Sequence, residues 1–226
     1  MVVTECDREQ QQDNSLPYVE LCFSVIGQTL PADHGYALYS ALKQTFLAGK
    51  NFPDDVLLSS ISGLPDKQGK IYLNKFSQLR LRFPAEKIQD WYRLQNLVLN
   101  IRGHLIRLVR PKLALPMASK SLKSRLVTFN LKEVNNHEMP VHFLESCQKA
   151  LNNLDIKGQV FIDSDTDGNL ARRALRIKEK HVVGFGIVVE GLSEEDSIKL
   201  QTNGLGGRKH FGCGWFFPIN EVDNEA

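Results

Sequence analysis

The amino-acid sequence predicts an α+β fold in which a β-α-β-β-α-β order of elements occurs twice. Segments in which apolar and polar residues alternate are typical of half-buried strands, and they are interspersed with segments whose apolar residues recur at helical spacing. These segments follow one another in the same order in both halves of the 226-residue chain. Because this order is that of the ferredoxin-like (RRM-like) fold, the sequence predicts two tandem ferredoxin-like domains.

The first half contains one complete set of these elements. Residues 18–27 alternate as a strand, and Asp33 is placed to cap a helix over residues 34–49, in which apolar residues recur four apart. Pro84 begins a second helix over residues 85–94. Further strands are predicted at residues 56–63, 71–73, 79–83 and 97–109.

The second half repeats this order with one strand more. Residues 139–154 form a predicted helix with its apolar residues on one face, and Ser193 caps a shorter helix that ends at Asn203. Strands are predicted at residues 125–130, 160–163, 174–177, 182–189 and 211–219.

Composition predicts where the domains begin and end. Residues 1–16 are polar and show no periodicity, so they are predicted to be a disordered lead-in. A stretch rich in Pro, Ser and Lys joins the two sets of elements. The predicted domains therefore span residues 17–116 and 117–220, and a short tail follows at residues 221–226.

The charged residues are unevenly distributed, although the formal net charge is only +2. No Asp or Glu occurs in residues 91–132, which contain nine Lys or Arg, and two further basic clusters lie at residues 172–180 and 208–210. Such segregation produces a surface potential that favours a polyanionic ligand. Each cluster alone is also compatible with a solvated strand face, but the three together predict nucleic-acid binding.

Several classes of protein are excluded by what the sequence lacks. The four cysteines form no CxxC pair, which predicts reduced thiols and neither a disulfide framework nor a zinc site. No segment approaches the roughly 18 apolar residues of a membrane helix, and the polar N-terminal segment is unlike a signal peptide. Residues 163–168 begin like a calcium loop, but position twelve is Ala174 and not the required Glu, which predicts a hairpin turn. We therefore expect a cytoplasmic protein without a membrane partner, metal or cofactor.

A glycine-rich segment precedes the last predicted strand. It carries five glycines in the eleven residues 204–214, together with Arg208, Lys209 and His210. It joins a helix to a strand, whereas a P-loop joins a strand to a helix, so a nucleoside-triphosphate site is not predicted. Glycines let the backbone approach a ligand closely and present N–H groups to phosphates, although such loops also serve as tight turns.

Three sequence blocks together resemble a known family. They are Gly-Leu-Gly-Gly-Arg-Lys at residues 204–209 with the Phe-Gly-Cys-Gly-Trp segment that follows, residues 30–42 in the first helix region, and residues 183–193. The sequence resembles the CRISPR repeat-processing endoribonucleases of the RAMP superfamily, in particular the MYXAN-subtype branch. The resemblance implies that the chain binds CRISPR repeat RNA and cleaves the precursor transcript within each repeat to give mature guide RNAs. It also implies a metal-independent reaction, in which a ribose 2′-hydroxyl attacks the phosphate and leaves a cyclic phosphate and a 5′-hydroxyl. Other subunits of a class 1 CRISPR effector complex are further candidate partners.

The candidate catalytic residues lie at the start of the first helix. His34 is the candidate base or acid, because the helix dipole favours its neutral form and because the family has a histidine on this helix. Tyr36 and Tyr39 share a helix face and are candidates for the acid or an orienting donor, with half-buried aromatics as the alternative. The sequence does not identify which Lys or Arg assists at the phosphate. This hypothesis requires the helix start to lie beside the glycine-rich segment.

The candidate RNA-binding residues are cations along the strand region 102–110, cations of a basic hairpin at 172–176, and residues of the glycine-rich segment. They are Arg102, His104, Arg107, Arg110, Arg172, Arg173, Arg176, Gly204, Gly206, Gly207, Arg208, Lys209 and His210. Two other hypotheses stay open at this point: a non-catalytic RNA-binding scaffold subunit of a CRISPR effector complex, and an unrelated ferredoxin-like binding module or small-molecule enzyme.

Overall fold

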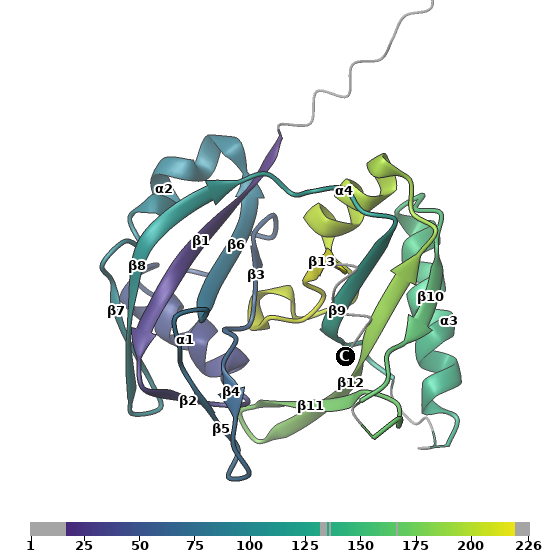
Figure 1. The fold of residues 1–226 in the computed structure, drawn as a ribbon, viewed down its shortest axis with the longest axis horizontal. Helices are drawn as coiled ribbons and strands as arrows, with labels where there is room; N and C mark the ends of the chain where they lie inside the picture. Colours follow the sequence, from purple (N-terminus) through teal and green to yellow (C-terminus); the bar gives the residue numbers. More distant parts are fainter. Residues whose placement is uncertain (1–16, 132–134, 136, 166, 220–226) are drawn as a thin grey trace, which may run out of the picture.

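The structure is a computed structural model that describes residues 17–131, 135, 137–165 and 167–219 (Figure 1). The predicted lead-in at 1–16 and tail at 221–226 lie outside the described residues. Within the described part of the chain, no helix is both long enough and apolar enough to cross a membrane.

The first half is built on a five-stranded antiparallel sheet. Its elements are β1 (Tyr18–Gly27), α1 (Gly35–Thr45), β3 (Leu57–Leu58), β6 (Gln78–Pro84), the 3₁₀ helix η1 (Ala85–Lys87), α2 (Ile88–Tyr92), β7 (Val98–Ile101) and β8 (His104–Ala114). The strand order is β3-β6-β1-β8-β7. In a ferredoxin-like set, β1, β3, β6 and β8 are the first, second, third and fourth strands, so the observed order is 2-3-1-4. β7 is an additional strand at the edge beside β8.

The second half has the same topology. Its elements are β9 (Ser121–Val127), α3 (Met139–Asn153), β10 (Gln159–Ile162), β11 (Arg172–Ile177), β12 (Lys180–Glu190), α4 (Glu194–Asn203), the 3₁₀ helix η2 (Lys209–Phe211) and β13 (Phe216–Pro218). The strand order is β10-β12-β9-β13, again the second, third, first and fourth strands, and β11 pairs with the free part of β12. The predicted tandem ferredoxin-like fold is therefore confirmed, and β11 is the additional strand.

A small third sheet lies beside the first. It consists of β2 (Thr29–Pro31), β5 (Lys70–Tyr72) and β4 (Leu64–Pro65), in the order β2-β5-β4. Because β2 directly precedes α1, this sheet fixes the position at which the first helix begins.

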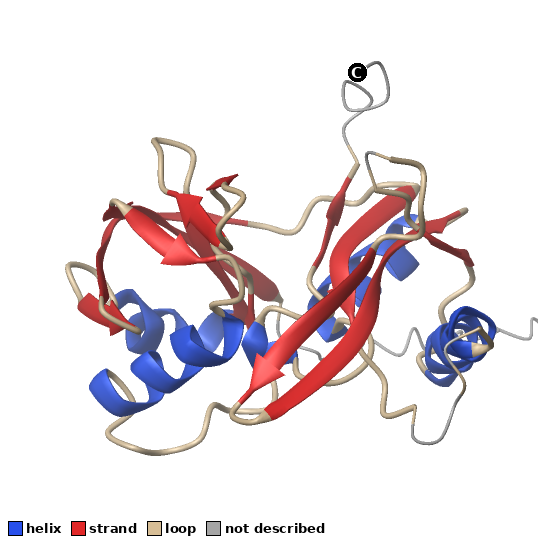
Figure 2. Ribbon diagram, turned by 90° about the horizontal axis from the view of Figure 1, so that it is seen from below, coloured by secondary structure: helices blue, strands red, loops and turns tan. Residues whose placement is uncertain are grey.

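Each large sheet buries one face under its helices. In the first half the buried apolar residues of β1 are Val19, Leu21, Phe23 and Val25, and α1 contributes Leu38 and Leu42 to the same core. Figure 2 shows helices gathered under the sheet of this half, and Figure 1 shows α3 on the outer side of the second sheet. Alternation then turns the other residues of β6, including Arg80 and Arg82, to the opposite face, towards the second half.

Two predicted strands are interrupted. Residues 97–109 form the hairpin β7–β8, because Arg102 and Gly103 both have positive φ and make a two-residue turn that the side chain of Asn100 supports. In residues 56–63 only β3 pairs with β6. The backbone N–H of Ser59 donates to the Arg80 carbonyl, and Ser59 Oγ accepts the backbone N–H of Arg80. After this residue the chain leaves the sheet.

The other differences concern the ends of elements. α1 ends at Thr45 and not at residue 49, since Ala48 and Gly49 adopt positive φ. The predicted strand 211–219 begins only at Phe216, because the positive φ of Gly212 and Gly214 prevents an extended backbone. Asp33 is not the N-cap: His34 occupies that position, and Asp33 Oδ2 accepts the backbone N–H of Arg176 at 2.7 Å. Ser193 caps α4 as predicted, and its Oγ accepts the N–H of Asp196.

Candidate active site

A cavity of about 580 Å³ lies between the two halves. The first half contributes His34, the serine-rich segment 59–62 and Arg80, and the second half contributes residues of β9, of β11, of the glycine-rich segment and of the chain that follows it into β13. Those from the second half are Arg125, Arg173, Gly212, Trp215 and Phe217. Neither half forms this cavity alone.

The glycine-rich segment reaches this cavity by packing against the start of α1. A Cβ built on Gly35 would lie 2.2 Å from the carbonyl oxygen of Phe211, so no residue with a side chain fits there without displacing the backbone. Next to it, a Cβ on Gly212 would lie 2.4 Å from Ser60 Oγ. The structure thus brings the helix start and the glycine-rich segment together, as the hypothesis of catalysis by His34 requires.

His34 is buried in a neutral, fully hydrogen-bonded form. Its side chain is 2% exposed, Nε2 lies 3.0 Å from the backbone N of Ile61, and Nδ1 lies 2.9 Å from the carbonyl oxygen of Pro31. Because a backbone N–H can only donate, Nε2 is the acceptor and Nδ1 carries the proton. Burial lowers the pKa of His34 to about 4. The neutral imidazole is available at neutral pH, but its lone pair already accepts the Ile61 N–H.

Tyr36 and Tyr39 pack against the glycine-rich segment and not into the cavity. Their ring centroids lie 5.5 and 4.8 Å from that of Phe211, and Tyr39 also contacts Phe52 at 5.2 Å and stacks with His210. Neither tyrosine is among the cavity-lining residues. In this arrangement they hold η2 on α1.

Arg125 and Arg173 line the cavity. Arg125 donates from Nη1 to Ser60 Oγ at 3.5 Å. Arg125 is still exposed to solvent, but the surrounding protein partly desolvates its guanidinium, and this effect and, next, the charge of Arg173 lower its pKa. Among the described residues, no ion pair joins either arginine to an acid. Like charges gathered in this way favour an anionic ligand. Arg173 is a predicted RNA-binding residue. The sequence reasoning missed Arg125, although its alternation with Lys123 on one strand is a usable signal.

The other predicted RNA-binding cations on strands lie outside the cavity. Arg102, His104, Arg107 and Arg110 belong to the β7–β8 hairpin, at the edge of the first sheet opposite β3. His104 Nδ1 lies 2.8 Å from Thr29 Oγ1. Arg172 and Arg176 flank Arg173 on β11, and of these three only Arg173 lines the cavity.

The predicted residues of the glycine-rich segment mostly bond within the chain. The backbone N–H groups of Gly204 and Gly207 donate to Leu200 and Thr128 carbonyls at 2.9 Å, and a Cβ on Gly206 would meet the same Thr128 oxygen. Arg208 donates to Thr128 Oγ1 and Lys209 to the Asn203 carbonyl, while His210 Nε2 lies 3.0 Å from the Pro53 carbonyl oxygen. Burial lowers the pKa of both Lys209 and His210. These glycines therefore shape the loop in this structure.

No metal-binding cluster of three or more His, Cys, Asp or Glu occurs in the described part of the chain. The described residues on either side of position 166 form the predicted turn: Asp165 Oδ1 accepts the N–H groups of Asp167 and Asn169, and Ser164 pairs with Leu170 in an isolated β-bridge.

Two ferredoxin-like units, a glycine-rich loop before the last strand and a cavity with arginines between the units agree with the resemblance to the RAMP superfamily. Comparison with known proteins makes this more specific. The family profile described as Cas6 Crispr matches residues 19–221. The CRISPR-associated endonuclease Cas6 of Myxococcus xanthus (strain DK1622) is 34% identical over 206 residues, which cover 91% of this chain and 83% of that protein. The chain belongs to the Cas6 family and is an endoribonuclease, which favours the enzyme over the scaffold hypothesis.

Solved structures agree on the fold. A CRISPR-associated protein Cas6 superposes with a TM-score of 0.61 at 14% identity, covering 90% of this chain and 99% of the other. A Cas6-related protein from Pyrococcus furiosus gives a TM-score of 0.62 at 12% identity, with the same coverage. A RAMP protein described as binding different RNA substrates gives 0.61 at 13% identity, again with this coverage.

Proposed function

We propose that this protein binds CRISPR repeat RNA and cleaves the precursor transcript once within each repeat, giving mature guide RNAs. The observation that carries the proposal is the cavity, because it joins a neutral histidine to two arginines that form no ion pair with an acid in the described part of the chain. The relative from Myxococcus xanthus is a CRISPR-associated endonuclease, which supports the same activity for this chain.

In the proposed reaction the ribose 2′-hydroxyl attacks the adjacent phosphorus, and the bond to the 5′-oxygen of the next nucleotide breaks. His34 Nε2 takes the proton of the 2′-hydroxyl, and the imidazolium formed can return a proton to the leaving 5′-oxygen. The products are a cyclic phosphate and a 5′-hydroxyl, and the atoms balance without a metal. For this step the ribose hydroxyl has to replace the Ile61 N–H at Nε2.

Arg125 and Arg173 are the proposed stabilisers of the phosphate, which gains negative charge in the transition state. A guanidinium can donate two parallel hydrogen bonds to phosphate oxygens. Tyr36 and Tyr39 are proposed to assist by holding Phe211 and the loop beside His34, and not as proton donors.

The test is cleavage of repeat RNA in EDTA by the wild-type protein and by His34→Ala, with His142→Ala as the matched control. His142 is also hydrogen-bonded, to Glu145, but it lies on α3 and does not line the cavity. We expect His34→Ala to cut about 10²–10⁴-fold more slowly while it still binds RNA, and His142→Ala to cut normally. An RNA with a 2′-deoxy sugar at the cut position should bind and stay intact. Normal cutting by His34→Ala, or cutting of the deoxy substrate, would refute the mechanism.

We also propose that the protein associates with other subunits of a class 1 CRISPR effector complex. Co-purification of tagged protein with those subunits tests this, and a protein that elutes alone when all are co-expressed argues against it.

A further inference from the structure

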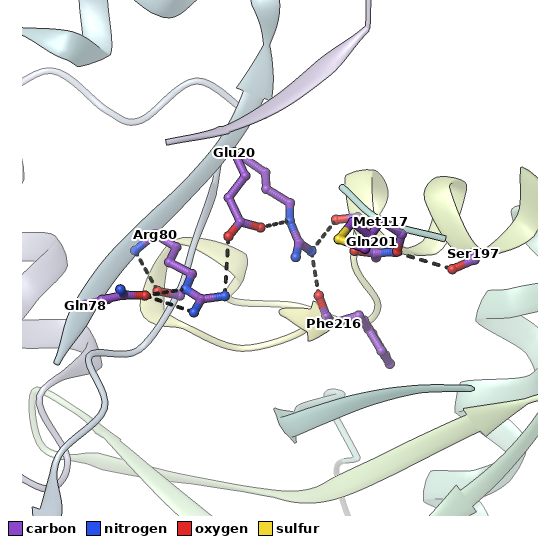
Figure 3. A network of polar contacts seen from close by, with 9 residues as sticks. Glu20, Gln78, Arg80, Met117, Ser197, Gln201 and Phe216 are labelled. Carbon is purple, nitrogen blue, oxygen red and sulfur yellow. Dashed lines mark hydrogen bonds and ion pairs between the residues drawn. The ribbon is translucent and has the colours of Figure 1, made fainter. Parts of the chain in front are cut away.

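One buried arginine connects the two halves. Arg82 of β6 points out of the open face of the first sheet and is only 2% exposed. Its Nε donates to Glu20 Oε2 at 2.8 Å, on the neighbouring strand β1. Its Nη1 donates to two carbonyl oxygens of the second half, Gln201 at 3.1 Å and Phe216. Figure 3 shows Glu20, Gln201 and Phe216 converging on this point.

The two carbonyls stand on either side of the glycine-rich segment. Gln201 lies in the last turn of α4, where carbonyls have no partner within the helix, and Phe216 is the first residue of β13. Between them the chain closes on itself: a Cβ on Gly204 would lie 2.6 Å from the Gly214 carbonyl oxygen. Arg82 therefore joins both ends of this loop to the first half of the chain.

The chemistry of the contact requires an arginine. The guanidinium is planar and donates in several fixed directions, which matches a carboxylate on one side and two carbonyls on the other. Its Cζ also lies 4.0 Å from the centre of the Trp215 ring, which is a cation–π contact. This contact lies in the interface between the two halves of the chain, which we call the seam. A lysine would keep the charge but could not satisfy this set of acceptors.

The tip of this loop, at Phe211 and Gly212, lies beside the start of α1, where His34 is the N-cap. Phe211 and Gly212 touch Gly35 and Ser60, beside the cavity. The first half thus holds the loop at its base through Arg82 and at its tip through α1 and the serine-rich segment. A shift of the base would move Gly212, Trp215 and Phe217, all of which line the cavity.

We infer that Arg82 is a positioning residue for RNA cleavage, which ties both ends of the glycine-rich loop to the N-terminal sheet and so sets the cavity around His34. The inference rests on the proposed function. Since Arg82 is buried and cannot touch RNA, its loss should slow the cleavage step and leave RNA affinity unchanged.

The experiment compares Arg82→Met and Arg82→Lys with Leu151→Ala. Leu151 is a buried residue of α3, which lies on the outer side of the second sheet (Figure 1), so this control loses core packing but keeps every hydrogen bond of Arg82. The single-turnover rate at saturating RNA and the Kd are measured at a temperature where circular dichroism shows each variant folded. We expect Arg82→Met to be slower by about 10²-fold, the magnitude of a small misplacement, with Kd unchanged. Arg82→Lys should be intermediate, and Leu151→Ala should cut like the wild type.

Hydrogen exchange of residues 204–214 provides a readout that does not depend on cleavage. We expect faster exchange in Arg82→Met than in Leu151→Ala. If the wild type does not cut RNA, the proposed function fails. Hydrogen exchange of residues 204–214 then still tests whether Arg82 holds the loop on the first half. Unchanged exchange, a wild-type cleavage rate in Arg82→Met, or a loss of rate equal to that of Leu151→Ala would overturn the inference. If Arg82→Met does not fold, Arg82→Lys and Glu20→Gln are measured in the same way and decide it.

Discussion

His34 should make the protein less stable in acid by a measurable amount. Its pKa is 6.5 in an exposed histidine and about 4 in the folded protein, mainly because burial disfavours the charged form. Between these two values the unfolded chain binds a proton at His34 and the folded chain does not. The free energy of unfolding should therefore fall as pH is lowered through this window, and this contribution is complete above about pH 6.5 and lost below about pH 4.

The size of this contribution to the free energy of unfolding follows from the same two pKa values. At about 1.4 kcal/mol for each pKa unit, the full contribution is about 3 kcal/mol. The imidazole is only 2% exposed, so solvent screening reduces this little. It is a large part of the roughly 5–15 kcal/mol that stabilises an ordinary domain.

The assay is urea denaturation at a series of pH values between 4 and 7.5, for the wild type and for His34→Gln. The glutamine carbonyl can still accept from Ile61 N–H but does not titrate in this range. All other titrating groups are shared by the two proteins, so the difference between their curves isolates His34. We expect the wild type to lose about 3 kcal/mol more than the variant. Parallel curves over this window would refute the description of His34 as a buried neutral imidazole.

Two further predictions concern the seam between the halves. Arg125→Ala should lower the single-turnover rate of RNA cleavage by about 10²–10³-fold, because one donor to the transition-state charge is lost. Cleavage assays of this variant and of Arg125→Lys check this prediction. An unchanged rate in Arg125→Ala would show that Arg125 does not act in the site. Gly35→Ala should lower the free energy of unfolding by about 1–3 kcal/mol, as overpacking does, because the added Cβ meets Phe211 O. Gly207→Ala is the control, since the nearest atom to its Cβ is 3.9 Å away. Equal stability of the two alanine variants would contradict the close packing of the loop on α1.

The topology could be predicted because it rests on local pattern. Alternation over residues 18–27 gives β1 with its observed ends, and the apolar face of residues 139–154 gives α3 to within one residue. The errors fall where a local turn overrides the alternation. The Arg102–Gly103 turn divides one predicted strand, and the glycines at 212 and 214 delay another.

The site could be predicted only in part, because its contacts join distant segments. The place of His34 at the start of α1 follows from the sequence, but its acceptor role towards Ile61, 27 residues later, does not. Alternation in Leu-Arg-Leu-Arg-Phe at residues 79–83 predicts a strand, which is confirmed as part of β6. The burial of Arg82 could not be predicted from this local pattern, because it is the second half of the chain that covers this side chain.

The arrangement also explains why the chain needs two similar units. A single ferredoxin-like sheet buries one face under its helices and leaves the other to solvent, where cations such as Arg80 and Arg125 would lie in high dielectric and act weakly. Apposing the two open faces places Arg125 and Arg173 on the wall of one cavity, where their charges act together on a single anion. Arg82, in contrast, is buried by the second half, and Glu20 with the two carbonyls beside the loop supplies its partners. The seam that concentrates positive charge near His34 is thus also the seam that this one arginine holds in register.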